Sequence, residues 1–198
     1  MKPLEFYINK FKYLDNDIDV SFIPPILKRR LSLLDKTALT VLKQTISDDV
    51  EYLLFSSQYG QIDRLNKIIE QYKSEQETSP NLFSCSVHNY SLGFFLLNIK
   101  KTVPYTALSS YKNSIAEGIL AAVISKYDNT LFCYADANNG ITNAFALNMS
   151  KAPSQNGVKY ILKQEQNNIS DESYDNFIKL FCGNIDYIKT QNYTIERA

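Results

Sequence analysis

Apolar and polar residues recur along this chain with two different periods, which predict both helices and strands. Apolar residues at helical spacing predict amphipathic helices over residues 31–46 and 62–72. Between them, residues 50–55 form a short apolar run bounded by polar residues, which is typical of a buried strand. The aromatic-rich residues 4–11 are predicted to be extended. The first third of the chain therefore alternates between strand and helix.

The centre of the chain combines an apolar segment, a short extended segment and a helix. Residues 92–99 are almost wholly apolar and fit a buried helix, although their length alone leaves a strand open. Residues 102–107 are predicted to be extended, and Pro104 among them favours the edge of a sheet over its middle. Apolar residues then recur at helical spacing over residues 115–123, which predicts a central helix.

Capping and turn residues delimit the remaining elements. Ser114 and Glu117 have the spacing of a capping box at the start of the central helix. Turns rich in Asn, Gly and Pro separate three predicted strands, at residues 131–135, 143–149 and 158–163. A last helix is predicted to be capped by Ser170 and to end at Gly183. This order of elements predicts an α/β fold with a mixed sheet, in a single domain over residues 1–198.

Composition and charge narrow the classes of function. The chain has 198 residues, 44% of them hydrophobic, which is enough for one sizeable core. Its 21 basic and 21 acidic residues cancel and are interspersed, so nucleic acid and anionic membranes are not expected partners. No apolar stretch has the length of a membrane span and no signal peptide is recognisable, so we expect a cytoplasmic protein. Fourteen tyrosines and eleven phenylalanines hint at a protein partner.

Cysteine and histidine supply the one constellation that suggests catalysis. Cys85 and His88 are three residues apart in a predicted loop, which invites a thiolate and imidazole pair in a free-standing acyltransferase or thioesterase. Nothing nearby in the sequence supplies an oxyanion hole or a third orienting group. Core packing of these residues is therefore the stronger interpretation.

Metal and cofactor sites are not expected. Adding Cys133 and Cys182 to Cys85 and His88 gives three cysteines and one histidine for zinc, but only one pair has ligand spacing. The six glycines stand too far apart for a dinucleotide fingerprint or a phosphate loop, so we predict no nucleotide cofactor. The three cysteines are odd in number and scattered, which favours reduced thiols.

Three short segments carry a resemblance to a known family. They are Arg29, Arg30, Leu31 and Ser32 ahead of the first predicted helix; Ser86, Val87, His88 and Asn89 ahead of the apolar segment; and Pro104, Tyr105, Thr106 and Ala107 ahead of the central helix. In this order, with a strand at residues 131–136 after them, they resemble the N-terminal half of a β-ketoacyl synthase. The likeness is to the short kind found beside aryl-polyene and type II polyketide genes, and it is strongest over residues 25–137. It implies one half of a thiolase-like fold, with a mixed five-stranded sheet and helices on both faces.

The resemblance also implies where a nucleophile would lie. In the family, a Thr, Ala, Cys turn places the catalytic cysteine at the N-terminus of a central helix, where backbone N–H groups favour the thiolate. Leu108 occupies that position here and has nothing to acylate. The family's two catalytic histidines lie in its second half, and nothing after residue 137 resembles either of their segments; the one histidine is His88. We therefore expect a chain without catalytic residues of its own.

Chain-length factors related to these synthases also lack the cysteine and act by pairing with an active synthase. The resemblance accordingly implies a heterodimer with a catalytic ketosynthase, or alternatively a homodimer, that serves an acyl carrier protein. The strand before the nucleophile pairs across the dimer axis in this fold, which predicts a subunit contact at Val103, Pro104, Tyr105, Thr106 and Ala107. Tyr90, Phe94 and Phe95 are candidates for the interface or the acyl tunnel, with core packing as the alternative. Lys28, Arg29 and Arg30 are candidates for a carrier-protein contact, with a solvated helix start as the alternative.

Overall fold

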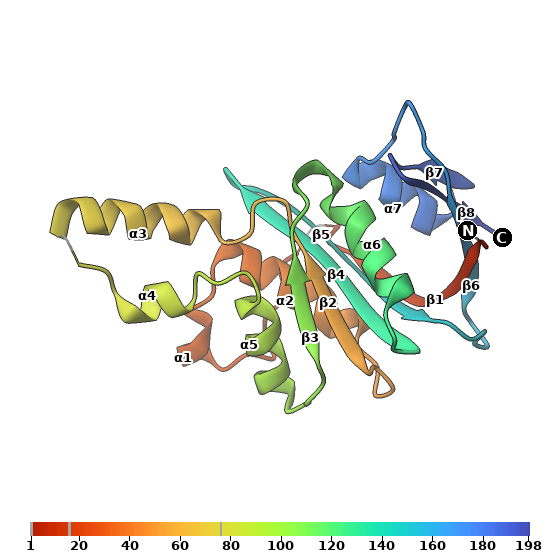
Figure 1. Cartoon of the computed structure of the whole chain (residues 1–198). Coiled ribbons are helices and arrows are strands. Elements are labelled where there is room, and N and C mark those ends of the chain that lie inside the picture. The colour runs from red at the N-terminus through yellow and green to blue at the C-terminus, as the bar shows by residue number, and fades with distance from the viewer. Residues whose placement is uncertain (1, 16, 76) are drawn as a thin grey trace.

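One mixed β-sheet runs through the computed structural model, which describes residues 2–15, 17–75 and 77–198 (Figure 1). The sheet has eight strands in the order β3-β2-β4-β5-β1-β6-β8-β7. Their bounds are β1 Leu4–Tyr13, β2 Tyr52–Ser56, β3 Tyr105–Leu108, β4 Asn129–Asn138, β5 Ile141–Ser150, β6 Val158–Gln164, β7 Tyr187–Lys189 and β8 Tyr193–Arg197. The α/β class with a mixed sheet is confirmed, whereas the sheet is wider than the five strands predicted.

Strand direction divides the sheet into two parts. β2 pairs in parallel with both β3 and β4, while β5, β1, β6, β8 and β7 continue from β4 in antiparallel pairs. The additional width lies at the far side of β1, where β6, β8 and β7 extend the sheet. β7 has only three residues and β8 only five. Such short strands carry too little alternation to be predicted from the sequence.

Helices cover both faces of the sheet. They are α1 Pro25–Lys28, α2 Leu33–Thr45, α3 Ile62–Glu75, α4 Pro80–Ser84, α5 Tyr90–Ile99, α6 Ser114–Ile124 and α7 Tyr174–Cys182. One core lies between the sheet and α2 with α5, around Leu39, Phe55 and Phe95. The other lies between the sheet and α6 with α7, around Phe132 and Phe145. The apolar segment at residues 92–99 is thus a buried helix, as its composition favoured.

The helix ends agree with the sequence in part. Gly183 ends α7 in the left-handed conformation with φ of 78°, as predicted. The cap of α7 is Ser173, whose side chain accepts from the Asn176 N–H, so the assignment of Ser170 was wrong. α6, in contrast, has no side-chain cap, because the Ser114 hydroxyl donates to the Ser57 carbonyl at 3.1 Å and does not accept from a backbone N–H of its own helix. The predicted capping box was therefore wrong.

The structure adds two short helices that the sequence pattern did not predict, α1 and α4. Each begins with a proline in its first turn, which has no N–H to leave unpaired there. In the described part of the chain, no helix has the length and apolar character needed to cross a membrane.

Candidate functional site

The carboxyl ends of β2, β3 and β4 meet at one edge of the sheet, because these three strands are parallel. In α/β sheets this edge is where ligands and catalytic groups usually gather. The edge holds the loop after β2, the end of β3 at Leu108, where the resemblance predicts the family nucleophile, and Asp136 in β4. It is therefore the place to ask what the chain can do chemically.

Leu108 is the last residue of β3 and lies opposite Ser56 of β2. Its carbonyl accepts a hydrogen bond from the Ser57 N–H at 3.4 Å, and its half-buried side chain packs on the core beneath α6. α6 begins only at Ser114, after a short 3₁₀ turn in which Tyr111 has a positive φ of 50°. The side chain at this position thus belongs to the core and offers neither a nucleophile nor a proton.

Asp136 holds the loop after β2 in place. One carboxylate oxygen accepts from the Gln58 N–H at 2.9 Å and from the Tyr134 hydroxyl at 2.5 Å, and the other accepts from the Tyr59 N–H at 3.0 Å. Burial raises the pKa of Tyr134, and the neighbouring Asp136 raises it further. This carboxylate is fully engaged in hydrogen bonds to its own chain, so its role here is to fix the loop.

His88 packs beside the same loop. Its ring lies edge-on to Phe55 with the ring centroids 5.4 Å apart, and a Cβ added at Gly60 would lie 3.3 Å from the imidazole Cδ2. Among the described residues, the buried Nε2 atom has no hydrogen-bond partner. Burial lowers the pKa of His88, and the more distant charge of Asp136 opposes this to a smaller extent. His88 is therefore a neutral, packed side chain at neutral pH.

Cys85 faces a different neighbour from His88. Its carbonyl accepts a hydrogen bond from Arg64, and its thiol lies against the Tyr90 hydroxyl. Burial raises the pKa of Tyr90, and the contact with Cys85 adds to this. The Cys85 thiol contacts Tyr90, whereas the His88 ring packs on Phe55 with its buried Nε2 atom unpaired, so the contacts of the described residues do not include the thiolate and imidazole pair that the spacing suggested.

The other two cysteines lie far from Cys85 in the fold. Cys133 is wholly buried in β4, where burial raises the pKa of its thiol, and Cys182 is exposed at the end of α7. Within the residues that the structure describes, no three metal-ligating side chains come together. The fold separates the four residues that could have formed a zinc set.

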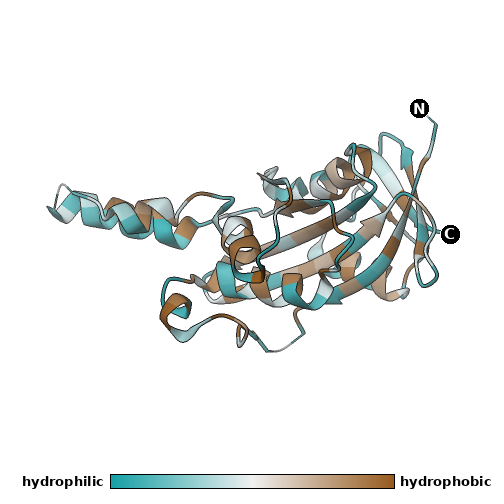
Figure 2. Cartoon of the chain, turned by 90° about the horizontal axis from the view of Figure 1, so that it is seen from below, coloured by the Kyte–Doolittle hydropathy of each residue, from teal (hydrophilic) through white to brown (hydrophobic). Residues whose placement is uncertain are grey.

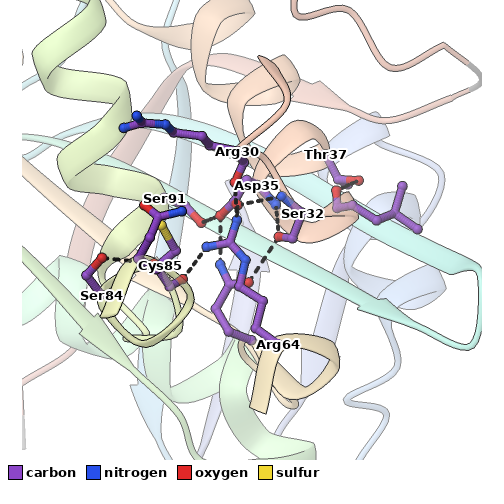
Figure 3. A network of polar contacts seen from close by, with 11 residues as sticks. Arg30, Ser32, Asp35, Thr37, Arg64, Ser84, Cys85 and Ser91 are labelled. Atoms are coloured by element: carbon purple, nitrogen blue, oxygen red, sulfur yellow. Dashed lines mark hydrogen bonds and ion pairs between the residues drawn. The ribbon is translucent and has the colours of Figure 1, made fainter. Parts of the chain in front are cut away.

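A buried ionic network lies behind the predicted basic segment. Asp35 in α2 is 0% exposed, and its carboxylate pairs with Arg64 of α3 at 2.5 Å (Figure 3). The same carboxylate accepts from the Gln61 side-chain amide and from the Ser91 hydroxyl, each at 2.7 Å. Asp35 also forms a capping box with Ser32 at the start of α2. α2, α3 and α5 are thus joined through one carboxylate.

One part of this network, the capping box at the start of α2, could have been predicted from the sequence. Ser32 and Asp35 have the spacing of a capping box, a Ser/Thr with an acidic residue three positions later. A capping box predicts a helix start but does not predict burial. Arg64 and Gln61 come from a distant part of the sequence, so only the fold brings them to Asp35.

The basic residues Arg29 and Arg30 line a groove of about 410 Å³, together with Lys67 of α3. Arg64 lies at its base and also donates to the Arg30 carbonyl at 2.6 Å. Lys28 ends α1 and is not among the residues that line the groove. Two of the three predicted carrier-contact residues therefore share one basic groove.

The predicted tunnel residues divide between core and surface. Phe95 is 0% exposed and packs edge-on to Phe22, which makes it a core residue. Tyr90 and Phe94 are half-buried with their rings 5.8 Å apart, and the Arg64 guanidinium lies over the Tyr90 ring. These two side chains are accessible from the surface, whereas Phe95 is not.

β3 forms one end of the sheet and has a neighbour only on the β2 side. The Pro104 carbonyl accepts from the Leu53 N–H of β2, and the Leu108 carbonyl accepts from the Ser57 N–H just after β2. Because backbone groups alternate in direction along a strand, those of Tyr105 and Ala107 point to the open side. Pro104, Tyr105 and Thr106 are exposed, while Val103 and Ala107 pack partly on the core beneath α5. The predicted contact segment is therefore an uncovered sheet edge in the chain on its own.

Fold and site together define a class of protein. A mixed sheet covered on both faces, with a strand, turn and helix that place Leu108 at the carboxyl edge of parallel strands, is a thiolase-like half. The N-terminal domain of β-ketoacyl synthases matches residues 9–176, and the chain belongs to this family. The match extends on both sides beyond residues 25–137, where the sequence resemblance was strongest.

Solved structures show the same fold. A chain of the complex of ketosynthase ApeO with its chain length factor ApeC from Xenorhabdus doucetiae matches with a TM-score of 0.70 at 16% identity, over 92% of this chain and 84% of that one. The ishigamide ketosynthase/chain length factor matches with a TM-score of 0.57 at 10% identity, over 77% of this chain and 53% of that one. A β-ketoacyl synthase from Burkholderia phymatum STM815 matches with a TM-score of 0.55 at 10% identity, over 69% of this chain and 46% of that one.

The lengths of these matches differ. This chain spans most of the matching chain of the Xenorhabdus complex but only about half of the other two. Among curated proteins, none matches the chain.

Proposed function

We propose that this chain is a non-catalytic, ketoacyl-synthase-like subunit of the chain-length-factor type. It pairs in the cytoplasm with an active ketosynthase in polyketide, aryl-polyene or fatty-acid-like chain extension on an acyl carrier protein. The observation that carries the proposal is Leu108, a half-buried aliphatic side chain packed against the core at the position that the resemblance assigns to the family nucleophile. Decarboxylative condensation begins by acylating a cysteine there, and leucine has no lone pair to donate.

The open edge of β3 supports pairing with a second subunit. An edge strand presents a row of N–H and C=O groups without strand partners, which makes it a ready template for another strand. Two of the similar solved structures contain a ketosynthase with a chain length factor. We further propose that residues 1–198 form one domain, since a single sheet links β1 to β8.

The basic groove supports a contact with the carrier protein. Arg29, Arg30 and Lys67 line it, and Asp63 is the acidic residue among the side chains at its surface. An acidic carrier surface or the phosphate of its prosthetic arm would be attracted there. We expect the substitutions Arg29→Gln and Arg30→Gln together to weaken carrier binding at low salt, with a smaller difference at high salt because surface charges are then screened.

Co-expression tests the pairing. The chain is produced with the condensing enzyme encoded nearest to it, and both the complex and the length of the acyl product are compared with and without the chain. We expect a stable complex and a changed product length. Unchanged products together with no complex would overturn the proposal.

Two substitutions in β3 make that test specific for the strand edge. Ala107→Pro removes an N–H that points to the open side, so it should weaken the complex and leave the fold intact, since proline is tolerated at sheet edges. Thr106→Pro removes an N–H on the β2 side and should destabilise the chain itself. Equal effects of the two substitutions on folding would contradict the assignment of β3 as a partner edge.

Covalent labelling tests the absence of a nucleophile. The isolated chain is incubated with a cerulenin-type electrophile and examined by mass spectrometry, and we expect no added mass. Leu108→Cys is the matched variant that restores a thiol at the family position. Labelling of the unchanged chain at Cys85 would contradict the proposal and favour a free-standing acyltransferase or thioesterase.

A further inference from the structure

One face of α3 carries apolar side chains that the described part of the chain leaves largely exposed. Leu65 is 47% exposed, Ile69 42% and Tyr72 60%, and their spacing of four and three residues places them on one side of the helix. The one buried residue of α3 is Arg64. Within the described residues, α3 packs mainly against α4 and not against the sheet. We call these three side chains the α3 stripe, and α3 with α4 the helical arm.

The helical arm is attached to the body at the base of α3 and braced by a contact between α3 and α4. At its base, Arg64 pairs with buried Asp35, and the Gln61 amide donates to the same carboxylate. Farther along α3, the Gln71 side-chain carbonyl accepts from the Ser79 N–H, just ahead of α4. A surface held by such contacts is already formed before a partner arrives, which lowers the ordering cost of binding.

The helical arm projects on the side of the molecule where the sheet ends at β3 (Figure 1). Figure 2 shows teal and brown residues alternating along α3, which stands apart from the sheet and its covering helices. Nine of the fifteen exposed large hydrophobic side chains in the described part of the chain lie between residues 59 and 111, the region that contains the arm, α5 and β3. They are Tyr59, Leu65, Ile69, Tyr72, Phe83, Val87, Leu97, Tyr105 and Tyr111. Exposed apolar residues concentrated in this way mark an interaction surface.

The area that a stable complex needs extends beyond β3. A standard protein interface buries roughly 800 Å² per partner and takes about 20–30 residues from each side. β3 contributes four residues. A partner that pairs with β3 must therefore cover neighbouring surface as well, and the helical arm provides apolar surface on that side.

The charges on α3 favour a protein partner over a membrane. Its three basic residues, Arg64, Lys67 and Lys73, are balanced by Asp63, Glu70 and Glu75. Helices that lie in a membrane surface are typically rich in Lys and Arg on their polar face. A mixed polar face around an apolar centre is instead typical of a protein interface.

We infer that the α3 stripe packs against the same ketosynthase subunit that pairs with β3, so that the helical arm extends the heterodimer contact. The inference rests on the proposed function for the identity of the partner. Tyr72 is the expected anchor, because buried tyrosines near the centre of an interface are among the residues that carry most of its binding energy.

A triple substitution tests the inference. Leu65→Gln, Ile69→Gln and Tyr72→Gln together remove the stripe and keep a residue that favours helix. The matched control is Asn66→Gln, Glu70→Gln and Lys73→Gln on the polar side of the same helix. Circular dichroism and thermal melting should be the same for both, since the replaced side chains are exposed. We expect the stripe variant to bind the co-expressed ketosynthase at least about tenfold more weakly and the control to bind as the unchanged chain does.

Hydrogen exchange provides an independent measurement. Backbone amides of α3 should exchange more slowly in the complex than in the free chain if the arm is covered. If the unchanged chain forms no complex with the ketosynthase, the proposed function fails. A different outcome is that the unchanged chain and the stripe variant bind the ketosynthase with equal affinity and show equal hydrogen exchange in α3. In that case the proposed function stands and the role of the α3 stripe is ruled out. If the stripe variant loses self-association and retains the ketosynthase, the occupant is a second copy of this chain and the inference is overturned.

Discussion

α2 and α3 are two amphipathic helices of similar length that the fold treats in opposite ways. α2 buries nine of its thirteen residues, including the wholly buried Leu39 and the charged Asp35. α3 buries only Arg64 among fourteen residues and leaves Leu65 at its surface. The two helices meet through the ion pair between Asp35 and Arg64.

The difference shows that an apolar stripe predicts a contact without naming its partner. The stripe of α2 is satisfied within the chain, against β4, β5 and α5. The stripe of α3 has no such cover in the described residues, and it lies on the side of the sheet where β3 is also uncovered. Apolar surface that a chain does not bury in its own core is available for another chain.

The largest expected effect comes from the ion pair that joins the two helices. Asp35→Ala should lower the free energy of unfolding by about 3–5 kcal/mol, because it leaves the Arg64 guanidinium buried without its partner. Denaturant unfolding measures the change. Lys36→Ala, at the next position of α2, is the control and should stay within about 0.5 kcal/mol. A loss for Asp35→Ala no greater than that of the control would show that Arg64 is not held by Asp35.

The apolar faces of the two helices should respond differently to truncation. Leu39→Ala in α2 should cost about 2–5 kcal/mol, because it opens a cavity in a packed core. Leu65→Ala in α3 should change the stability of the free chain by no more than about 0.5 kcal/mol. Comparable losses in the two unfolding curves would mean that α3 is covered within the chain.

The loop that leads into α3 should tolerate a methyl group poorly at Gly60. Gly60 has a positive φ of 56°, so Gly60→Ala should cost about 1–2 kcal/mol from backbone strain. The added Cβ would also lie 3.3 Å from the His88 ring. Gly140→Ala is the control, because Gly140 has φ of 78° and open space around it. The contact with His88 is measured by how much more unfolding free energy Gly60→Ala loses than Gly140→Ala. Equal losses for the two substitutions would show that this contact is loose.

The smallest effect is a pH dependence from His88 beside that loop. Burial lowers the pKa of His88 below its ordinary value of 6.5, so the unfolded chain takes up the proton first as the pH falls. Stability should therefore be unaffected by this residue above pH 6.5 and should decline below it. His88→Gln should remove that part of the decline, as followed by thermal melting from pH 7.5 to 5.5. Identical slopes for the two chains in this range would contradict a buried, neutral His88.

Much of the fold could be predicted from periodicity. The helices at residues 31–46, 62–72 and 115–123 and the strands in the first and last thirds correspond to α2, α3, α6 and their neighbouring strands. The elements that escaped prediction are short: α1, α4, β7 and β8 have between three and five residues. Few residues carry little periodic signal, and their conformation is set by the elements against which they pack.

The site was predictable only where a residue's own chemistry decided the outcome. A leucine side chain carries no nucleophile in any fold, whereas the assignment of Leu108 to the family's nucleophile position stays a prediction. Cys85 and His88 are close in sequence, but the fold turns one towards Tyr90 and the other towards Phe55. Spacing along a loop does not fix the direction of a side chain, which depends on the surrounding core.

The family and the mixture of helices and strands could be predicted from the sequence. These follow from side-chain chemistry and from local periodicity, which do not depend on distant neighbours. Folding was needed to bury α2 and leave α3 projecting, to place β3 at the end of the sheet, and to bring Arg64 to Asp35. Burial, strand order and ion pairs join residues that are far apart along the chain, so they exist only once the chain has folded.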